Sequence, residues 1–344
     1  MRIKGKLTVL VGVLAITMVA AACGGDDDGG NGDTGGDTSG LSGTITISGS
    51  STVQPISNLV AELFAEQNPD VQVSVDGPGT SDGFVLFCDG DTDVQDASRA
   101  IEEEEIAACE ENGVDFVELE VSLDGLTVLT NPANSVECLN TGDLYALFGP
   151  ESEGFENWSE ADALAEQVGG NGGFPDAPLE ITAPGEESGT YGAFIELSGI
   201  PDTAVENGVK EDDSEALRKD YQASPDDNVI ITAMEGTDSA LGFVGFAFAE
   251  EAGDQVKEIA VDGGDGCVAP SIETVSDGSY PLSRSLYIYV NTGKASGNEA
   301  LQGYVDLYVS EEGLNTAVEE VGYIPLPTDR QDATRSTWQS DGGA

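Results

Sequence analysis

The 344-residue sequence contains no histidine and only 12 lysines and arginines. The absence of histidine excludes Ser-His-Asp triads and every metal site that uses imidazole ligands. The 65 aspartates and glutamates give a formal net charge of −53. This charge argues against nucleic acids and anionic membrane surfaces as partners, because like charges repel. The acidity by itself indicates a well-solvated surface rather than a cationic ligand.

Cysteine is also scarce, and the spacing of the cysteines excludes common metal and redox motifs. Four cysteines follow the N-terminal region, and none of them belongs to a C-x-x-C pair, so we expect no zinc or redox site. The sequence has no G-x-x-x-x-G-K-S/T motif, and its Gly77-x-Gly79 stretch does not continue as G-x-G-x-x-G. A nucleotide-binding fold is therefore disfavoured, and we expect neither a metal nor a cofactor.

The first 22 residues have the pattern of a signal peptide. Three basic residues at positions 2, 4 and 6 precede an apolar run over 7–22, which is too short for a membrane span. The run ends in three alanines followed by Cys23, which is similar to the lipobox of bacterial lipoproteins. That similarity implies cleavage before Cys23 and lipidation of its thiol. The alternative is a plain secretory signal with a chance cysteine. Residues 23–40 then form a Gly/Asp-rich flexible linker.

From residue 41 onward, segments with strand-like and helix-like patterns alternate. Strands are expected over 44–47, 71–75, 93–98, 116–121, 126–130, 179–183, 240–248, 256–261 and 285–291. Helices are expected over 55–64, 102–111, 141–148, 159–168, 228–235, 299–309 and 312–320. This alternation predicts an α/β fold with largely parallel sheets. Residues 328–344 are polar and are expected to be frayed.

Three turns rich in hydroxyl groups and glycine each follow an expected strand and precede a helix. They are Ser50-Ser51-Thr52, Gly79-Thr80-Ser81 and Ser188-Gly189-Thr190. At the carboxyl ends of the strands in an open α/β sheet, such turns direct N–H and hydroxyl groups at one ligand. Three of them converging on one cleft would surround a small tetraoxyanion. Each turn alone is equally consistent with an ordinary capped helix start.

Arg99 is a candidate cation for an anionic ligand, because it comes directly after the expected strand 93–98. A guanidinium can bind two oxygens of a phosphate at once. The alternative is a surface salt bridge between Arg99 and the neighbouring glutamates 102–105.

Several motifs in the same order are similar to those of the PstS family, the phosphate receptors of bacterial high-affinity phosphate ABC transporters. The motifs are Gly49–Pro55, Phe87–Asp93, Ala97–Arg99, Pro184–Thr190, Ala240–Phe246, Asp277–Pro281 and Leu286–Asn291. The resemblance covers residues 44–327 and implies a two-lobed type II periplasmic-binding fold, which is α/β and closes on dehydrated phosphate without catalysis.

The same resemblance divides the chain into lobes. The first lobe is expected over 41–125 and 282–328, and the second over 126–281, with crossover strands near 126–130 and 285–291. A polar tail would follow over 329–344.

The resemblance also assigns site residues. Matching position by position gives phosphate contacts from Ser51, Thr52, the amide of Val53, Thr80, Ser81, Ser188, Gly189 and Thr190. Family members carry an aspartate where this chain has Arg99, and an arginine where it has Pro184. We therefore hypothesise that the charges are exchanged between lobes. Arg99 is then the donor, and Glu187, or alternatively Glu186, accepts the proton of monohydrogen phosphate.

The four remaining cysteines suggest two disulfides in an exported protein, and three connectivities are open. We expect Cys88–Cys109 and Cys138–Cys267, because each pair then lies within one expected lobe.

Together these features predict a lipid-anchored, extracytoplasmic and monomeric receptor. It would bind inorganic phosphate and deliver it to a membrane permease, without enzymatic activity and without nucleic acid. The alternatives are a receptor for sulfate or molybdate, a secreted phosphoester hydrolase, and an acidic adhesin that binds no small ligand.

Overall fold

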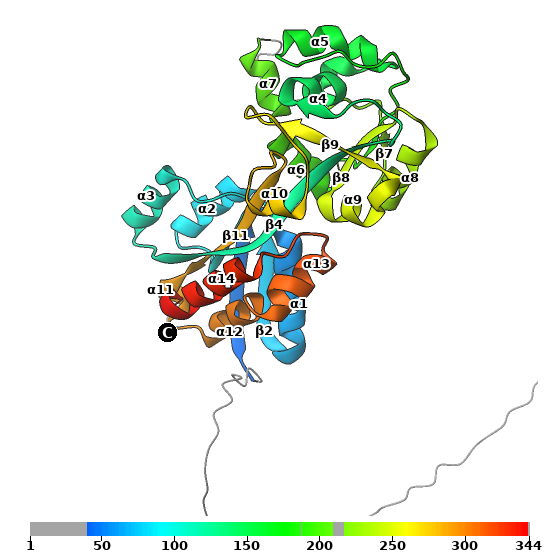
Figure 1. Cartoon of the computed structure of the whole chain (residues 1–344). Coiled ribbons are helices and arrows are strands. Elements are labelled where there is room, and N and C mark those ends of the chain that lie inside the picture. The colour runs from blue at the N-terminus through cyan, green and yellow to red at the C-terminus, as the bar shows by residue number, and fades with distance from the viewer. Residues whose placement is uncertain (1–39, 187, 209–216, 343–344) are drawn as a thin grey trace, which may run out of the picture. The chain divides into compact units, whose positions relative to one another are not determined.

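The computed structural model describes residues 40–186, 188–208 and 217–342, in which strands and helices alternate (Figure 1). The strands are β1 (Ser42–Gly49), β2 (Asp70–Asp76), β3 (Val94–Ala97), β4 (Phe116–Thr130), β5 (Cys138–Asn140), β6 (Thr182–Ala183), β7 (Gln222–Ala223), β8 (Leu241–Gly245), β9 (Lys257–Asp262), β10 (Cys267–Val268) and β11 (Ser283–Asn291).

The longer helices are α1 (Gln54–Gln67), α2 (Thr80–Cys88), α3 (Glu103–Asn112), α4 (Thr141–Phe148), α6 (Gly189–Ser198), α8 (Asp227–Gly236), α12 (Glu299–Tyr308) and α14 (Thr328–Asp341). The shorter ones are α5 (Asp162–Gln167), α7 (Ile200–Glu206), α9 (Phe246–Ala252), α10 (Ile272–Ser276), α11 (Thr292–Ala295), α13 (Val318–Glu320), the 3-10 helices η1 (Pro150–Ser152), η2 (Trp158–Ala161) and η3 (Gly253–Gln255), and the π-helix η4 (Glu312–Ala317).

The expected signal peptide, Cys23 and the linker up to residue 39 lie outside the described residues. Within the described ranges, no helix has the length and apolar character of a membrane span.

Strand β4 runs between two hydrophobic cores, and β11 begins directly after Leu282 of the second core. In the described chain, nine strands form one sheet in the order β10-β9-β4-β11-β3-β1-β2, with β5 beside β9 and β8 beside β4. The first part of β4 pairs with β11, and its second part pairs with β8 and β9. The register between β4 and β11 shifts between Leu286 and Tyr287. We expected two strands separated near Asp124, but β4 is a single strand of 15 residues.

The sheet is mixed, so the expectation of largely parallel pairing is wrong. β1 pairs in parallel with β2 and β3, whereas β11 pairs antiparallel with both β3 and β4. β4 carries the chain from the first core to the second, and β11 begins the return to the first. Two neighbouring strands that carry the chain in opposite directions must be antiparallel. The crossover strands therefore impose the antiparallel pairs.

The first lobe, which we define by the core around β1, β3 and β11, has helices on both faces of its sheet. The side chains of β11 alternate between these faces. Leu286, Ile288 and Val290 belong to the core that includes α1 and α12, whereas Tyr287 and Tyr289 pack with α2 and α3. This alternation is the reason that β11 reads as one long apolar strand in the sequence.

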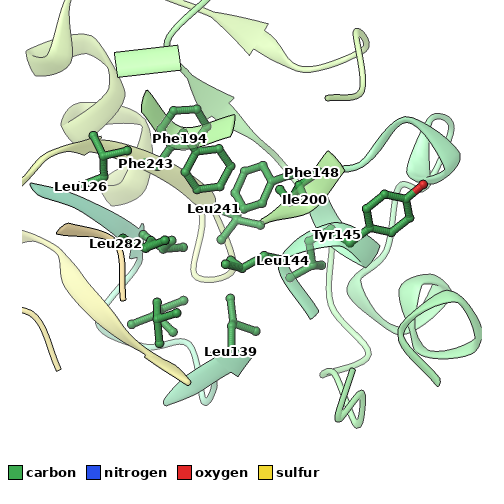
Figure 2. Close-up of a cluster of buried hydrophobic side chains, with 14 of the residues drawn as sticks. Leu126, Leu139, Leu144, Tyr145, Phe148, Phe194, Ile200, Leu241, Phe243 and Leu282 are labelled. Carbon is green, nitrogen blue, oxygen red and sulfur yellow. The ribbon is translucent and has the colours of Figure 1, made fainter. Parts of the chain in front are cut away.

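The second lobe is built on the core around β8 and the second half of β4. Phe194 of α6 stacks on Phe243 of β8 with ring centroids 3.9 Å apart, and Phe148 of α4 packs edge-on against both rings (Figure 2). A smaller cluster with Ile230 and Met234 of α8 covers the other side of β8. The aromatic stack fixes α6, which begins at the third hydroxyl turn.

Both expected disulfides are present. Cys88 at the end of α2 is bonded to Cys109 of α3, and Cys138 of β5 is bonded to Cys267 of β10. The first bond ties α2, which begins at the second hydroxyl turn, to its neighbouring helix.

The C-terminal segment is a helix rather than the frayed tail that we expected. Residues 328–341 form α14, and Trp338 on it is 7% exposed within the core of the first lobe. Its indole N–H donates to Asp306 at 2.7 Å. Arg330 pairs with Glu120 of β4 and donates to Ser285 of β11 at 2.9 Å. The composition gives no signal for α14, because Trp338 is its one large apolar residue.

We predict that Trp338→Ala lowers the free energy of unfolding by about 3 kcal/mol, because it removes a large buried side chain and leaves a cavity. Chemical denaturation of the wild type and the variant measures this loss. Gln339→Ala, at an exposed position of the same helix, is the control and should change stability by less than about 0.5 kcal/mol. Equal stability of the two variants would mean that α14 does not support the core.

Candidate functional site

A backbone hydrogen bond to β3 fixes the first hydroxyl turn. The Ser50 amide donates to the Asp96 carbonyl at 2.7 Å, and Gly49 has φ 140°. A Cβ on Gly49 would lie 2.1 Å from the same carbonyl oxygen, so only glycine allows this approach. The Ser50 hydroxyl accepts from the amides of Thr52 and Val53 at 3.1 and 3.4 Å. The amides that we expected to face the ligand therefore bond to Ser50, and Val53 is fully buried.

The second hydroxyl turn is bonded to the first turn and to the end of β3. The Gly79 amide donates to the Gly49 carbonyl at 2.9 Å. The Thr80 hydroxyl lies 3.0 Å from the Ser98 hydroxyl, and the Thr80 carbonyl accepts from Gln95 at 2.8 Å. Neighbouring residues of one short strand thus fix both turns, Asp96 by its carbonyl and Gln95 by its side chain.

Arg99 forms the salt bridges that we gave as the alternative to ligand binding. Its guanidinium makes two hydrogen bonds of 2.8 Å to Glu105 and lies 3.3 Å from Glu102. It also donates to the Ser81 hydroxyl at 3.0 Å and lies over the Phe84 ring, 5.6 Å from its centroid. The hydrogen bonds to Glu105 raise the pKa of Arg99. Arg99 therefore lies in the region of the second turn, but carboxylates of its own lobe already neutralise it.

The third hydroxyl turn begins α6. The Ser188 hydroxyl accepts from the Thr190 amide at 3.2 Å and caps the helix. Gly189 is exposed beside it, at the positive end of the helix dipole. Glu186 is also exposed, whereas Glu187 lies outside the described residues.

The sequence analysis missed a second guanidinium. Arg284 lies near the start of β11, and its side chain is only 13% exposed. Its Nε donates to buried Asp124 of β4 at 3.2 Å, and one Nη donates to the Thr52 hydroxyl at 3.2 Å. The other Nη pairs with Glu196 of α6. Burial acts to lower the pKa of Arg284, but the attraction of Asp124 and Glu196 is stronger and raises it.

Two adjoining cavities bring the turns and the two arginines together. We call the first the guanidinium cavity; it has a volume of about 510 Å³ and is lined by residues 78–82, Ser98, Arg99, Glu196 and Arg284. We call the second the hydroxyl cavity; it has a volume of about 360 Å³ and is lined by Ser51, Thr52, Glu186, Ser188, Gly189, residues 191–193 and Glu196.

The three turns are thus divided between the two cavities. The second turn lines the guanidinium cavity, and the first and third turns line the hydroxyl cavity. Glu196 borders both. Uncharged donors combined with a guanidinium can bind a small oxyanion.

Within the part of the chain that the structure describes, no group of three or more cysteine or acidic residues is arranged to hold a metal ion.

Comparison with known proteins identifies the family. A family model described as a PBP superfamily domain matches residues 34–312. Phosphate-binding protein PstS of Staphylococcus saprophyticus is 31% identical over 92% of this chain and 90% of its own length. The chain is a PstS-type member of the PBP superfamily.

Two further relatives extend this result for the PstS-type chain. Protein SphX of Synechocystis is 37% identical over 83% of this chain and 79% of its own length. A crystal structure of a possible phosphate binding protein from Planctomyces limnophilus is 34% identical, covers 87% of this chain and 98% of its own, and superposes with a TM-score of 0.77. The resemblance that we inferred from the motifs, and the α/β fold that it implied, are confirmed.

The sequence of this PstS-type chain contains only a weak signal for Arg284 and none for its contact with Glu196. Arg284 is one of nine basic residues beyond the signal segment, and it lies between two of the family motifs. Glu196 falls two turns into a helix, where a carboxylate is ordinary. Nothing in the sequence places Glu196 opposite Arg284, because that contact joins segments 88 residues apart.

A buried carboxyl group lies directly beneath the first turn. Asp96 is fully buried, and its Oδ1 accepts from the Ser57 hydroxyl of α1 at 2.9 Å. Tyr308 of α12 lies 3.2 Å from the same hydroxyl. Among the described residues, Asp96 Oδ2 has no hydrogen-bond partner. Burial raises the pKa of Asp96 to about 8, and the Ser57 hydrogen bond opposes that rise.

We predict that Asp96→Asn makes the pH dependence of stability shallower between about pH 4 and pH 8. Because the pKa of Asp96 is raised in the folded state, the folded protein binds the proton more tightly than the unfolded chain. This contribution is complete below the unfolded pKa and is lost as the pH rises through about 8. Asp96→Asn removes this dependence of the free energy of unfolding on pH, which is at most about 1.4 kcal/mol for each pH unit.

Denaturation at a series of pH values measures the slope. Asp91→Asn, at an exposed position near β3, is the control and should keep the wild-type slope. A variant at Asp96 with the wild-type slope would show that Asp96 is ionised in the folded protein.

Proposed function

We propose that this PstS-type protein is the substrate-binding component of a phosphate ABC transporter, which binds inorganic phosphate in the cleft between its lobes and delivers it to the membrane permease. Its membership of the family supports this function, and so does the name of the relative PstS, a phosphate-binding protein. The observation that carries the proposal is the meeting of three hydroxyl turns and a buried arginine at two adjoining cavities.

The donors in the cleft suit a dehydrated oxyanion. The proposed contacts are the hydroxyls of Ser51, Thr52, Thr80, Ser81, Ser188 and Thr190 and the amide of Gly189, with Arg284 as the central cation. The hydroxyls are largely fixed by bonds within the protein, so they lose little conformational freedom when a ligand binds. Arg99 contributes less, since Glu105 and Glu102 already neutralise it.

Selectivity for phosphate requires a carboxylate that accepts the proton of monohydrogen phosphate. Glu186 lines the hydroxyl cavity and is one candidate, with Glu187 as the other. The protein would act by binding alone, which agrees with the complete absence of histidine.

We predict that Arg284→Gln weakens phosphate binding about 10- to 100-fold, because it removes a charge-assisted hydrogen bond of about 1.5–3 kcal/mol. Calorimetric titration of the chain beginning after Cys23 measures the affinity for phosphate, sulfate and molybdate. A thermal melt confirms that each variant is folded. Arg335→Gln, on α14, removes the same charge elsewhere and should bind as the wild type does.

Three outcomes would contradict this function. The wild type could bind no phosphate, it could prefer sulfate or molybdate, or Arg284→Gln could leave the phosphate affinity unchanged in a folded protein. The second outcome would favour a receptor for another oxyanion.

The proposed location is the outer face of the cell membrane, where a lipid on Cys23 would anchor a monomer through the linker 24–40. We predict that Cys23→Ser abolishes incorporation of labelled fatty acid into the protein, because the lipidated thiol is lost. Metabolic labelling of the full-length chain measures this change. Ser39→Ala in the linker is the control, and a wild-type protein that takes up no label would exclude the anchor.

A further inference from the structure

The pair formed by Arg284 and Glu196 is unlike the other contacts of the cleft, because its two partners differ in exposure. The side chain of Arg284 is 13% exposed and that of Asp124 is 4% exposed, whereas that of Glu196 is 56% exposed. Asp124 and Arg284 also face each other across the β4–β11 ladder, which fixes them to the sheet. The Asp124 contact is therefore a permanent part of the fold, while the Glu196 carboxylate can move into solvent.

Glu196 holds the ligand-facing part of the guanidinium. Arg284 gives its Nε to Asp124 and one Nη to Thr52, both of which are buried, so the Nη bound to Glu196 is the one with an exposed partner. Glu196 also borders the guanidinium cavity and the hydroxyl cavity. An oxyanion that binds this Nη from the guanidinium cavity must therefore compete with the Glu196 carboxylate.

We propose that Glu196 is a specificity-determining residue of the cleft, whose carboxylate competes with dissolved anions for Arg284 so that only oxyanions with two negative charges displace it. This inference rests on the proposed function, because it assumes that the cleft binds an oxyanion.

Whether an anion displaces Glu196 depends on its charge and on its concentration relative to the effective concentration of the carboxylate. A carboxylate attached to α6 faces Arg284 at an effective concentration in the millimolar range or above. A monoanion such as chloride or nitrate carries the same charge as this carboxylate, so the exchange brings no electrostatic gain. A dianion forms stronger charge-assisted bonds with the guanidinium and with the hydroxyl donors of both cavities.

This competition also sets the affinity for the ligand itself. If Glu196 occupies Arg284 for most of the time, the binding-competent fraction is small, and the apparent dissociation constant rises in inverse proportion to that fraction. Removal of the carboxylate charge should therefore strengthen binding of every oxyanion and admit monoanions. A residue that only fastens α6 to β11 would change stability without either effect.

The test uses Glu196→Gln, which keeps the shape of the side chain and removes its charge. Glu206→Gln is the matched control, because Glu206 is exposed on α7 of the same lobe and lines a separate cavity. Calorimetric titrations with phosphate and sulfate are made in the absence and presence of chloride and nitrate.

We expect Glu196→Gln to bind phosphate about 3- to 10-fold more tightly than the wild type, and its phosphate affinity to fall as chloride or nitrate is added. The wild type and Glu206→Gln should share one affinity that depends less on these salts. Unchanged binding by Glu196→Gln would overturn the proposal, and weaker binding would show that Glu196 assists the ligand instead of competing with it.

A second measurement separates this inference from the proposed function. Thermal melts of Glu196→Gln, Arg284→Lys and the double variant, all in phosphate-free buffer, test the pair without a ligand. Shifts that simply add would overturn the inference. If the wild type binds sulfate and not phosphate, the proposed function fails, and the inference is decided by the change in sulfate affinity. If no anion binds, both fail.

Discussion

The contacts of one guanidinium connect the parts of this cleft. Arg284 bonds to Asp124 beside it in the sheet, to Thr52 of the first turn and to Glu196 of the second lobe. A buried cation needs a carboxylate partner, because an unpaired charge in the interior is strongly destabilising. Asp124 meets this need, and the two Nη groups of Arg284 bond to Glu196 and Thr52 at the border of the guanidinium cavity. In a chain of net charge −53, this local arrangement is the one that we propose for recognising an anion despite the acidic surface.

The uncharged N–H and hydroxyl groups of the first two hydroxyl turns are held in place by β3. Two adjacent residues of this strand hold two turns, since the Asp96 carbonyl accepts from Ser50 and the Gln95 side chain donates to Thr80. Successive side chains point to opposite faces of the strand. Asp96 therefore reaches α1 through Ser57, and Gln95 reaches the start of α2. A strand of four residues fixes the spacing between the two turns.

Most of the fold could be predicted from the sequence, because apolar periodicity and turn residues are local signals. The two disulfides followed from the number of cysteines and their division between the expected lobes. Local patterns failed where distant residues decide the structure. The continuous strand β4 depends on pairing with β8, β9 and β11, and α14 depends on one buried tryptophan. The hydroxyl turns were found because glycine and serine mark them. Arg284 and Glu196 were missed because only the folded chain brings them together, and Arg99 was favoured although its neighbouring glutamates neutralise it.

The unbroken course of β4 determines how the two lobes are mechanically joined. The connection includes the hydrogen-bonded strands β4 and β11. A change in the angle between the lobes therefore requires these two paired strands to twist. A ladder resists shear but allows twist, especially where its register is irregular. The bulge at Leu286 and Tyr287 lies two residues from Arg284. This irregular point of the joint is thus adjacent to the buried arginine that borders the guanidinium cavity.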